Sequence, residues 1–523
     1  MKFHCSHVVL CLAAISSVSL TARILALFNY NARSHFIMFE PLLRGLANRG
    51  HEVFVVGHFP QKTPIPNYTD INVQDSIPSV VNNFTVEYVR SFGLVNQLRF
   101  IWEKTLEMCE TVMNHPEVQE LIRNSDTHKF DLIITHIFGP DCFLGFSHIF
   151  NAPFISLVTS VALPWTNDRV GNPDNPSYIP NFFLPFTQRM NFGERIINTI
   201  FNEIMKIGNY YFSELPMDKL ARKYLGEDIP SITELKKNTS LIMANSHFSL
   251  NTPRPTIPAF VEVGGLHLKT DGKLPKDLKT YLDNSKEGVI YFCLGSLIKS
   301  STLPEDKKQM FIEAFSNTKL NVLWKIDEIS GLPDNVKTYK WFPQFEILKH
   351  PNVRMFITHG GLMGTMEGVY TGVPMIGVPM FADQELNINV CVMKGIAILL
   401  DFDTLTTEKI TNAIDAILNN LSYRKNAKKL SELFRDRPHT ALETAIYWTE
   451  YVIRHRGARH MRSAAIDLPW YQYLLLDVIL VLLVGTIVSI YILYYAVKVS
   501  LRLLLPYLEE KRLKSLKFIS KEE

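Results

Sequence analysis

Residues 358–368 read THGGLMGTMEG. They begin at the last residue of the apolar run Met355–Thr358 and lead into a segment with helical spacing. Two adjacent glycines between a strand and a helix allow a tight turn. A strand, a short turn and a helix form the repeating unit of parallel sheets covered by helices. Such a turn also exposes backbone N–H groups at a helix N-terminus, which favours phosphate binding. A turn that only connects the two elements is the alternative, since glycine pairs alone are weak evidence.

The same alternation of apolar runs and helical segments extends along most of the chain. The expected strands are Ile24–Phe28, Val53–Val56, Leu132–Thr135, Phe154–Val158, Val289–Leu294, Val322–Ile326, Met355–Thr358, Met375–Val378 and Ile396–Leu400, with an early helix at Phe36–Asn48. Prolines and glycines gather between Asn251 and Pro275, which indicates a linker. The pattern predicts an α/β fold of two facing, doubly wound, Rossmann-like domains at 23–250 and 281–470, joined by a linker at 251–280. We expect the ligand in the cleft between them.

Composition narrows the class of protein. The 523 residues suffice for two domains of ordinary size. A formal net charge of +3 lacks the basic excess of a nucleic-acid-binding protein. Cys109, Cys142, Cys293 and Cys391 show neither a C-x-x-C pair nor a histidine at metal-ligand spacing. We expect buried free thiols and no zinc site.

The N-terminus has the features of a secretory signal peptide. Lys2 precedes the apolar run Val8–Ile15, and small residues follow, so a signal peptide over 1–22 is predicted. The rest of the chain would then enter the secretory pathway. Four N-x-[ST] sequons agree with that compartment, at Asn67, Asn83, Asn238 and Asn420.

The C-terminus has the features of a membrane anchor. Val478–Val497 contains no charged residue, is flanked by aromatic residues and is followed by lysines and arginines. This pattern predicts a transmembrane helix over 474–497 and a cytosolic basic tail over 498–523. A buried core helix is the alternative for the apolar run.

Several polar residues near the glycine turn have ligand-binding chemistry. An indole such as Trp341 can stack on a flat base, while the amide of Gln344 can pair with the edge of that base. His359 can donate to a phosphate oxygen, and Glu367 can accept from ribose hydroxyls. Asp383 and Gln384 follow a strand and can hold sugar hydroxyls, and Ser296 is a further phosphate donor. Taken singly, each could be a packing, capping or turn residue.

Together these segments resemble the UDP-glycosyltransferases of the UDP-glucuronosyltransferase type, in the form of invertebrate members. The shared motifs are Trp341-Phe342-Pro343-Gln344, the L-x-H-P of Leu348–Pro351, FITHGG at Phe356–Gly361, a G-V-P triplet, FADQ at Phe381–Gln384, RGARHMR at Arg456–Arg462 and DLPWYQY at Asp467–Tyr473. The resemblance runs from the signal peptide to the membrane tail. It implies the GT-B fold, with an N-terminal acceptor-binding domain and a C-terminal UDP-sugar-binding domain.

The resemblance also implies a role for each donor-site residue. Trp341 and Gln344 would hold uracil, Glu367 the ribose, and Asp383 and Gln384 the transferred sugar. Ser296, His359 and Gly364 would hold the diphosphate, with Gly360, Gly361 and Thr365 completing the turn. The family implies a UDP-sugar as co-substrate, with no cofactor and no metal.

His35 matches the family's catalytic histidine, which removes a proton from the acceptor hydroxyl. Histidine titrates near neutral pH, so it suits general-base work. Relatives orient this histidine with an acidic residue, but this sequence has His136 at the aligned position, and the nearest carboxylate is Asp141. Either Asp141 takes the orienting role, or catalysis is weakened. Without the family context, an exposed or helix-capping histidine is the alternative.

The resemblance implies an inverting transfer of glucose or glucuronic acid from a UDP-sugar to a small lipophilic acceptor, in detoxification or in hormone or pigment conjugation. It places the chain in the endoplasmic reticulum membrane as a single-pass type I protein with luminal catalytic domains, and it allows homo- or hetero-oligomers with relatives. Invertebrate-like details favour glucose. Aromatic residues that could line the acceptor pocket or the core are Phe28, Phe36, Phe39, Phe92, Phe100, Trp102, Phe182, Phe183 and Phe186. A catalytically weak or inactive UDP-sugar-binding partner of an active relative is the second hypothesis, and a single-span receptor is the third.

Overall fold

The computed structural model describes residues 21–28, 30–77, 80–138, 141–269, 272–327 and 329–520. The chain forms two compact units, residues 1–463 and residues 464–523. Residues 1–20, which make up most of the predicted signal peptide, lie outside the described residues.

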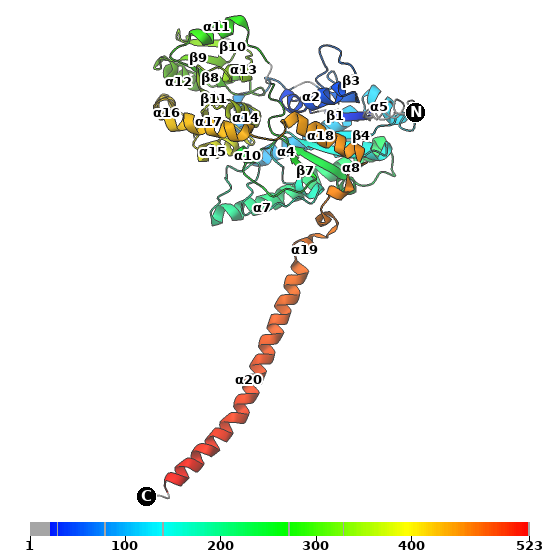
Figure 1. Cartoon of the computed structure of the whole chain (residues 1–523), viewed down its shortest axis with the longest axis vertical. Coiled ribbons are helices and arrows are strands. Elements are labelled where there is room, and N and C mark those ends of the chain that lie inside the picture. Colours follow the sequence, from blue (N-terminus) through cyan, green and yellow to red (C-terminus); the bar gives the residue numbers. More distant parts are fainter. Residues whose placement is uncertain are drawn as a thin grey trace, which may run out of the picture. The chain divides into compact units, whose positions relative to one another are not determined.

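The N-terminal half of the first unit is built on a seven-stranded parallel sheet with the strand order β3-β2-β1-β4-β5-β6-β7 (Figure 1). Its strands are β1 (Arg23–Phe28), β2 (Glu52–Gly57), β3 (Tyr68–Asn72), β4 (Leu132–His136), β5 (Phe154–Val158), β6 (Thr239–Ala244) and β7 (Phe260–Glu262). Its helices are α2 (Arg33–Asn48), α3 (Val86–Ser91), α4 (Leu94–Met113), α5 (Pro116–Arg123), α6 (Gly145–Ile149), α7 (Phe192–Asn209), α8 (Leu215–Leu225), α9 (Ile232–Lys236) and α10 (Phe248–Asn251). Every residue of β4, β5 and β6 is buried, as expected for strands that helices cover on both faces.

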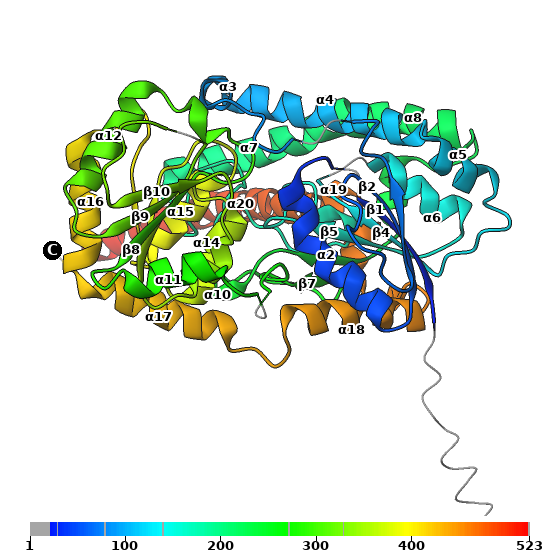
Figure 2. The same ribbon diagram turned by 90° about the horizontal axis from the view of Figure 1, so that it is seen from above.

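The C-terminal half repeats this plan with a six-stranded parallel sheet in the order β10-β9-β8-β11-β12-β13 (Figure 2). Its strands are β8 (Val289–Cys293), β9 (Asn321–Lys325), β10 (Val336–Tyr339), β11 (Val353–Thr358), β12 (Met375–Gly377) and β13 (Ala397–Leu399). Its helices are α11 (Lys276–Asn284), α12 (Glu305–Ser316), α13 (Gln344–Leu348), α14 (Leu362–Thr371), α15 (Gln384–Met393), α16 (Thr407–Asn419) and α17 (Leu421–Arg435). The expected fold class of two doubly wound α/β halves is confirmed.

The two halves differ from the expected boundaries in two places. Strand β7 belongs to the first sheet, although it lies inside the segment 251–280 that was expected to be a linker. Helix α18 (Ala441–Arg454) follows α17 but returns to the first half, where it lies beside α2 (Figure 2). Glu450 accepts a hydrogen bond from the Nε of Arg49 at 2.6 Å. The C-terminal segment of the first unit therefore fastens the two halves together.

A disulfide corrects the expectation of four free thiols. Cys109 of α4 and Cys142, at the start of a 3-10 turn (Asp141–Leu144), are joined, whereas Cys293 and Cys391 are free and buried. The paired cysteines lie 33 residues apart on separate elements, so their spacing alone gave no signal. Disulfides persist in oxidising compartments.

The second unit contains α19 (Trp470–Tyr473) and the long helix α20 (Leu476–Ile519) (Figure 1). Among the described residues, α20 is the one helix long and apolar enough to cross a membrane. It continues without a break through residues 498–519, most of the segment expected to be the cytosolic basic tail. Charged pairs at helical spacing support this extension, such as Lys514 with Glu510 at 2.6 Å.

Candidate active site

The two sheets direct their carboxyl ends toward a shared cavity of about 610 Å³. Its lining comes from segments after β1, β3, β4, β5 and β7 of the first sheet and from segments at or after the ends of β8 to β12 of the second sheet. This is where doubly wound sheets bind ligands. The candidate residues that line the cavity are His35, Ser296, Trp341, Gln344, His359, Gly361, Gly364, Glu367, Asp383 and Gln384. Asp141, Gly360 and Thr365 were also expected in the site but do not line the cavity.

The glycine turn between β11 and α14 shapes the centre of the cavity. Gly360 has a φ of +86°, and a Cβ there would lie 2.7 Å from the backbone oxygen of Gln384. A Cβ at Gly361 would lie 2.7 Å from Nε2 of His359. Thr365 is buried and donates to the Gly361 carbonyl at 3.1 Å. Gly360 and Thr365 therefore contact the buried side of the turn and not the side that faces the cavity.

His359 carries a neutral imidazole that can form hydrogen bonds, and it lies just before the N-terminus of α14. Burial lowers the pKa of its imidazole to about 4, and the positive charge of Lys325 adds to the shift. Its Nδ1 is buried and has no hydrogen-bond partner within the described chain. The N-terminus of α14, with Gly361 as its N-cap, lies beside it. Together they offer polar groups to an anionic ligand, such as a phosphate.

Trp341 and Lys325 form one end of the cavity. Trp341 is 58% exposed, so its indole face is accessible. The Nζ of Lys325 lies 5.1 Å from the centre of that ring and donates to the Gly295 carbonyl at 2.5 Å. Lys325 itself is buried, and the sequence had not singled it out. Lys325 is the last residue of a parallel strand, and this position could have marked it as a site residue in the sequence.

Gln344 and Glu367 form a hydrogen-bonded pair beside Trp341. The Nε2 of Gln344 donates to Oε2 of Glu367 at 2.6 Å. Burial raises the pKa of the Glu367 carboxyl to about 7; the hydrogen bond from Gln344 opposes this shift, and the nearby Glu346 adds to it. Gly364 leaves room for this pair, because a Cβ there would lie 3.2 Å from Nε2 of Gln344.

Asp383 and Gln384 start α15 after a turn that holds a strained residue. Ala382 has a φ of +57°. Gln384 accepts from the backbone N–H of Met380 at 2.8 Å, and Asp383 accepts from Asn387 at 2.8 Å. Burial raises the pKa of the Asp383 carboxyl to about 6, so it is mostly ionised at pH 7. The turn presents one carboxylate and one amide to the cavity.

His35 enters the cavity from the opposite half. It lies in the first turn of α2, because this helix begins at Arg33, three residues before the expected start at Phe36. Its Nδ1 lies 3.0 Å from the hydroxyl of Thr159 and 3.5 Å from Nε2 of His136. The same Thr159 hydroxyl lies 3.4 Å from that nitrogen of His136. These two side chains are the hydrogen-bond partners of the His35 ring among the described residues.

Among the described residues, the cluster formed by His35, His136 and Thr159 (the His35 cluster) therefore contains no carboxylate. Burial lowers the pKa of His35 to about 3. Burial lowers the pKa of His136 well below its usual value, and the charge of His35 adds to that shift. Both imidazoles are neutral at pH 7. Thr159 directly follows strand β5. The sequence analysis predicted the end of this strand at Val158 but did not identify Thr159 as a site residue.

Asp141 does not orient His35 in this structure. Both of its oxygens accept from one guanidinium nitrogen of Arg169, at 2.8 and 2.6 Å. Asp141 and Arg169 are 6% and 2% exposed, so they form a buried ion pair. A buried carboxylate needs such a partner, and Arg169 supplies it.

A strap of the N-terminal half, residues 82–97, binds the C-terminal half at the edge of the cavity. Asn82 donates its backbone N–H to the Ser296 carbonyl at 2.9 Å, and Phe84 donates to Leu297 at 3.2 Å. Further along, Gln97 accepts from the backbone N–H of Ala382 at 3.2 Å. This strap fixes Ser296 and the turn before Asp383 against the N-terminal half.

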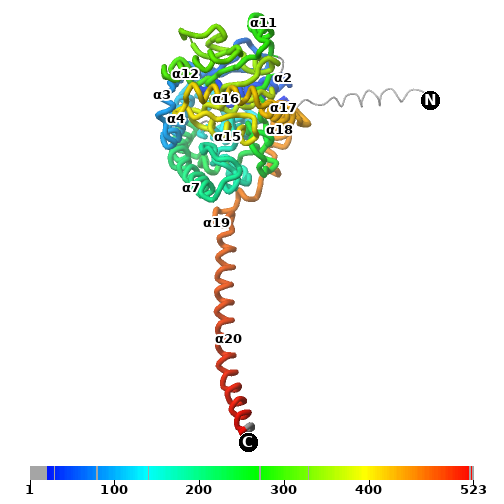
Figure 3. The backbone as a smooth tube through the Cα atoms, turned by 90° about the vertical axis from the view of Figure 1, so that its left-hand side faces the viewer, coloured from blue at the N-terminus to red at the C-terminus, as the bar shows by residue number. Residues whose placement is uncertain are grey.

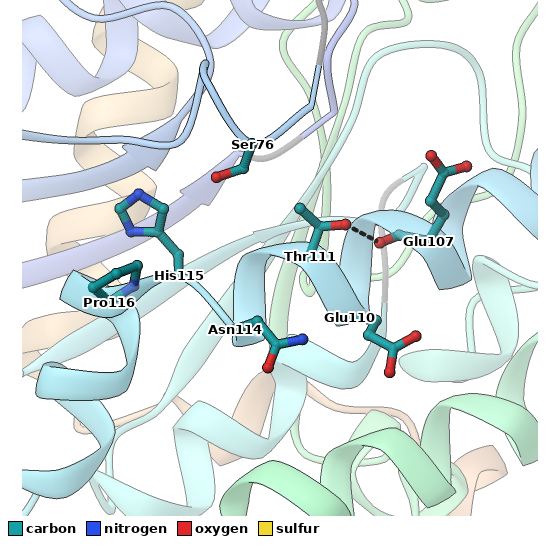
Figure 4. Close-up of a pocket in the computed structure, with 7 residues that line it drawn as sticks. All are labelled: Ser76, Glu107, Glu110, Thr111, Asn114, His115 and Pro116. Carbon is teal, nitrogen blue, oxygen red and sulfur yellow. Dashed lines mark hydrogen bonds between the residues drawn. The ribbon is translucent and has the colours of Figure 1, made fainter.

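A second, open pocket of about 360 Å³ lies where α4 ends and α5 begins (Figure 4). Its lining residues are Ser76, Glu107, Glu110, Thr111, Asn114, His115 and Pro116. Glu107 and Glu110 already pair with Lys104 and Lys223. In the described part of the chain, no three His, Cys, Asp or Glu side chains are grouped to hold a metal ion.

The asparagines of all four sequons are exposed at the surface. Asn67, Asn238 and Asn420 lie in turns or at element ends, and Asn83 lies within the strap. Surface loops are where an oligosaccharide can be attached.

Two parallel-sheet halves that share one cavity at their carboxyl ends define the GT-B class of glycosyltransferases. The structure resembles the glycosyltransferase of kitacinnamycin (TM-score 0.55, 16% identity, 82% of this chain and 99% of that chain). It also resembles glycosyltransferase VinC in complex with dTDP (TM-score 0.57, 16% identity, 83% and 100%). At this identity the likeness shows the fold.

The family follows from sequence comparison. Residues 26–507 match the family model "UDP-glucoronosyl and UDP-glucosyl transferase", and the chain belongs to this family. UDP-glucosyltransferase 2 of Dactylopius coccus is 42% identical over 492 residues, covering 93% of this chain and 94% of the relative. UDP-glucuronosyltransferase 2B19 of Macaca fascicularis is 32% identical, covering 87% and 90%. The chain is therefore a UDP-glycosyltransferase whose co-substrate is a UDP-sugar.

Proposed function

We propose that this chain transfers a hexose from a UDP-sugar to a hydroxyl group of a small lipophilic acceptor, with inversion at the anomeric carbon. One observation carries this proposal: His35, His359 and Asp383 line a single cavity although they belong to different halves or different loops. A base for the acceptor, an anion site and a sugar site thus lie within reach of one bound pair of substrates.

The C-terminal half would bind the donor. The exposed indole of Trp341 stacks on uracil, and Gln344 pairs with its edge. Glu367 accepts from the ribose hydroxyls. The diphosphate lies at the N-terminus of α14, within reach of His359 and Ser296. Asp383 and Gln384 hold the hydroxyls of the transferred sugar.

His35 would act as the general base. In the tautomer that the reaction requires, Nδ1–H of His35 donates to Thr159, whose hydroxyl donates to Nε2 of His136. This leaves Nε2 of His35 free to take the proton of the acceptor hydroxyl. The acceptor oxygen then forms its bond to the anomeric carbon as the bond from that carbon to the β-phosphate oxygen breaks. The electron pair leaves with UDP, stabilised by the helix N-terminus and His359.

The acceptor would lie against aromatic side chains of the N-terminal half. The phenylalanines that line the cavity from this half are Phe84, Phe92, Phe100, Phe138, Phe182 and Phe183. Phe28, Phe36 and Phe39, by contrast, are buried in the core. An apolar wall with few polar groups suits a lipophilic acceptor, as in the detoxification of such compounds.

We infer that glucose is the preferred donor sugar. The relative at 42% identity bears the name of a UDP-glucosyltransferase, whereas the named glucuronosyltransferase is 32% identical. The ionised Asp383 also disfavours a second carboxylate beside it.

We propose a single-pass type I arrangement in the endoplasmic reticulum membrane, with residues 23–463 luminal. Helix α20 supplies the span and its basic end the cytosolic side. The Cys109–Cys142 disulfide and the four exposed sequons fit an oxidising lumen. Endoglycosidase treatment of detergent-solubilised microsomes should shift the mobility of the chain, whereas protease added to intact microsomes should leave residues 23–463 undigested. No shift, together with digestion of residues 23–463 by added protease, would contradict this topology.

The function is tested by transfer in microsomes that contain the full chain. Labelled UDP-glucose and UDP-glucuronic acid are each offered with a panel of phenols, and NMR gives the configuration of the product. We expect a β-glucoside from α-linked UDP-glucose. A product that retains the α-configuration would refute inversion by His35.

A second function is favoured by the absence of a carboxylate beside His35 among the described residues. A neutral His136 cannot stabilise an imidazolium as a carboxylate would. The chain would then bind UDP-sugar as a weak or inactive partner of an active relative. UDP binding without transfer to any phenol in the panel would support this reading.

A further inference from the structure

Helix α7 has an outward face that is more apolar than its inward face. The outward side chains are 43% to 71% exposed and are Phe192, Ile196, Ile197, Ile200, Ile204, Ile207 and Tyr211, the last just beyond the helix end. At ~100° per residue they lie within an arc of roughly 140°. Every exposed isoleucine in the described part of the first unit lies on this helix. Glu203 is exposed and charged and lies roughly 20° inside one end of this arc, next to Phe192.

Buried asparagines fix this orientation. Asn198 accepts from the backbone N–H of Asn181 at 2.8 Å and donates to the Ile179 carbonyl at 2.9 Å. Asn202 accepts from the side chain of Asn181 at 2.6 Å. Rotating the helix to bury its isoleucines would leave these buried polar groups without partners, at a cost of about 1–3 kcal/mol each. The apolar face therefore points outward because the inward face is polar and fully bonded.

The exposed face is large for a protein surrounded by water. Seven side chains that expose about half of their area amount to on the order of 600 Å². Patches of that size mark an interaction surface. Helix α7 lies at the outer edge of the first unit, and no other described element of that unit lies over its outward side (Figures 1 and 3).

Chain length indicates what covers this face. Only the segment 464–475 separates the first unit from α20. At ~3.6 Å per residue it spans at most roughly 43 Å. A bilayer that holds α20 is therefore always close to the first unit. Aromatic rings at both ends, Phe192 and Tyr211, with isoleucines between them, match a helix that lies in the membrane interface.

We propose that α7 lies in the luminal phospholipid interface, with its isoleucine face among the upper acyl chains. This gives the first unit a second membrane contact besides α20. The proposal rests on the membrane anchoring stated under the proposed function.

The test uses the full chain reconstituted in phosphatidylcholine bilayers. Ile200→Cys carries an environment-sensitive fluorophore, and Leu433→Cys on α17 is the matched control, because the two native side chains are 55% and 51% exposed. Cys293 and Cys391 are buried, and the unsubstituted chain serves as the labelling blank. We expect lipids brominated in the upper acyl chain to quench the probe at position 200 severalfold more than the probe at position 433.

Two quenching results would overturn the proposal, and a separate extraction experiment tests the anchoring by α20 on which the proposal rests. Equal quenching of both probes by aqueous iodide, with none by brominated lipid, refutes the lipid contact. A probe at position 200 that is shielded from iodide but not quenched by brominated lipid indicates a second copy of the chain and also refutes it. Release of the full chain by alkaline carbonate would refute the anchoring by α20 itself, whereas a retained chain with an unquenched probe refutes only the role of α7.

Discussion

The two sides of the active-site cavity are built in different ways. Most of the donor side comes from one short stretch of sequence, Trp341–Gln384. Its candidates lie in turns after parallel strands or in the helices that follow these turns. The side with His35 is assembled from His136 and Thr159, which lie more than 100 residues further along the chain. Three carboxyl groups line the donor side, those of Glu346, Glu367 and Asp383, whereas none is among the described hydrogen-bond partners of His35. Donor binding and proton removal should therefore respond differently to mutation and to pH.

The largest effect on stability is expected at Asp141, which was a candidate partner of His35. Asp141→Asn leaves the buried guanidinium of Arg169 without its counter-charge, and should lower the free energy of unfolding by about 3–5 kcal/mol. Transfer per folded molecule should keep the wild-type pH profile. Urea unfolding of the full chain in detergent measures the first quantity. A normal unfolding midpoint with a shifted pH profile would instead restore Asp141 to the catalytic group.

Glu367→Gln should weaken UDP binding about tenfold while it stabilises the fold at high pH. The folded-state pKa is raised from 4.5 to about 7, so ionisation of Glu367 costs stability as the pH rises through 7. The free energy of unfolding of the variant should thus exceed that of the wild type by at most roughly 3 kcal/mol at pH 8, and the two should be equal at pH 4. Thermal unfolding at both pH values checks this. Glu346→Gln is the control, and an equal gain there would contradict a specific role for Glu367.

The pH dependence of transfer should be determined by ionisable groups on the donor side of the cavity. Asp383 ionises with a pKa of about 6, so its hold on the sugar hydroxyls weakens as the pH falls from 7 to 5. The KM for UDP-glucose should rise more than the Kd for UDP over this range. Both constants depend on Glu367, which has a pKa of about 7 and is also protonated, whereas only the sugar contacts Asp383. His35 stays neutral throughout, because its pKa is about 3. A fall in kcat with a midpoint near 6.5 would show that His35 titrates as an ordinary histidine.

The smallest effect is expected where the two sides meet. Gln97→Ala removes the acceptor for the N–H of Ala382 and should raise the KM for the donor sugar a few-fold, with UDP affinity unchanged. Gln119→Ala on α5, outside the strap, is the control. Steady-state kinetics of both variants would show whether the strap positions the sugar-binding turn, and equal values would contradict it.

The sequence predicted what depends on local pattern. Apolar runs such as Phe154–Val158 became fully buried strands, and ten of the thirteen residues placed in the catalytic and donor sites line the cavity. Contacts between distant residues could not be predicted in this way. The Asp141–Arg169 pair and the Cys109–Cys142 disulfide join elements 28 and 33 residues apart, and nothing in their spacing marks them.

Helix α7 shows a second limit of pattern reading. Its apolar and polar residues alternate with helical spacing, which ordinarily predicts that the apolar face is buried. The structure buries the asparagines because Asn181 and the carbonyls before the helix satisfy them. Which face of an amphipathic helix points inward is decided by partners that periodicity does not reveal.

The separation of donor binding from proton removal is tested most directly by His35→Ala, with His148→Ala, a surface histidine of α6, as its control. UDP affinity and transfer to a phenol are measured on the same microsomal preparation. We expect His35→Ala to bind UDP like the wild type and to lose transfer by roughly 10²- to 10⁴-fold, whereas His148→Ala keeps both. Transfer retained by His35→Ala, or lost together with UDP binding, would contradict the assignment of the base to the N-terminal side of the cavity.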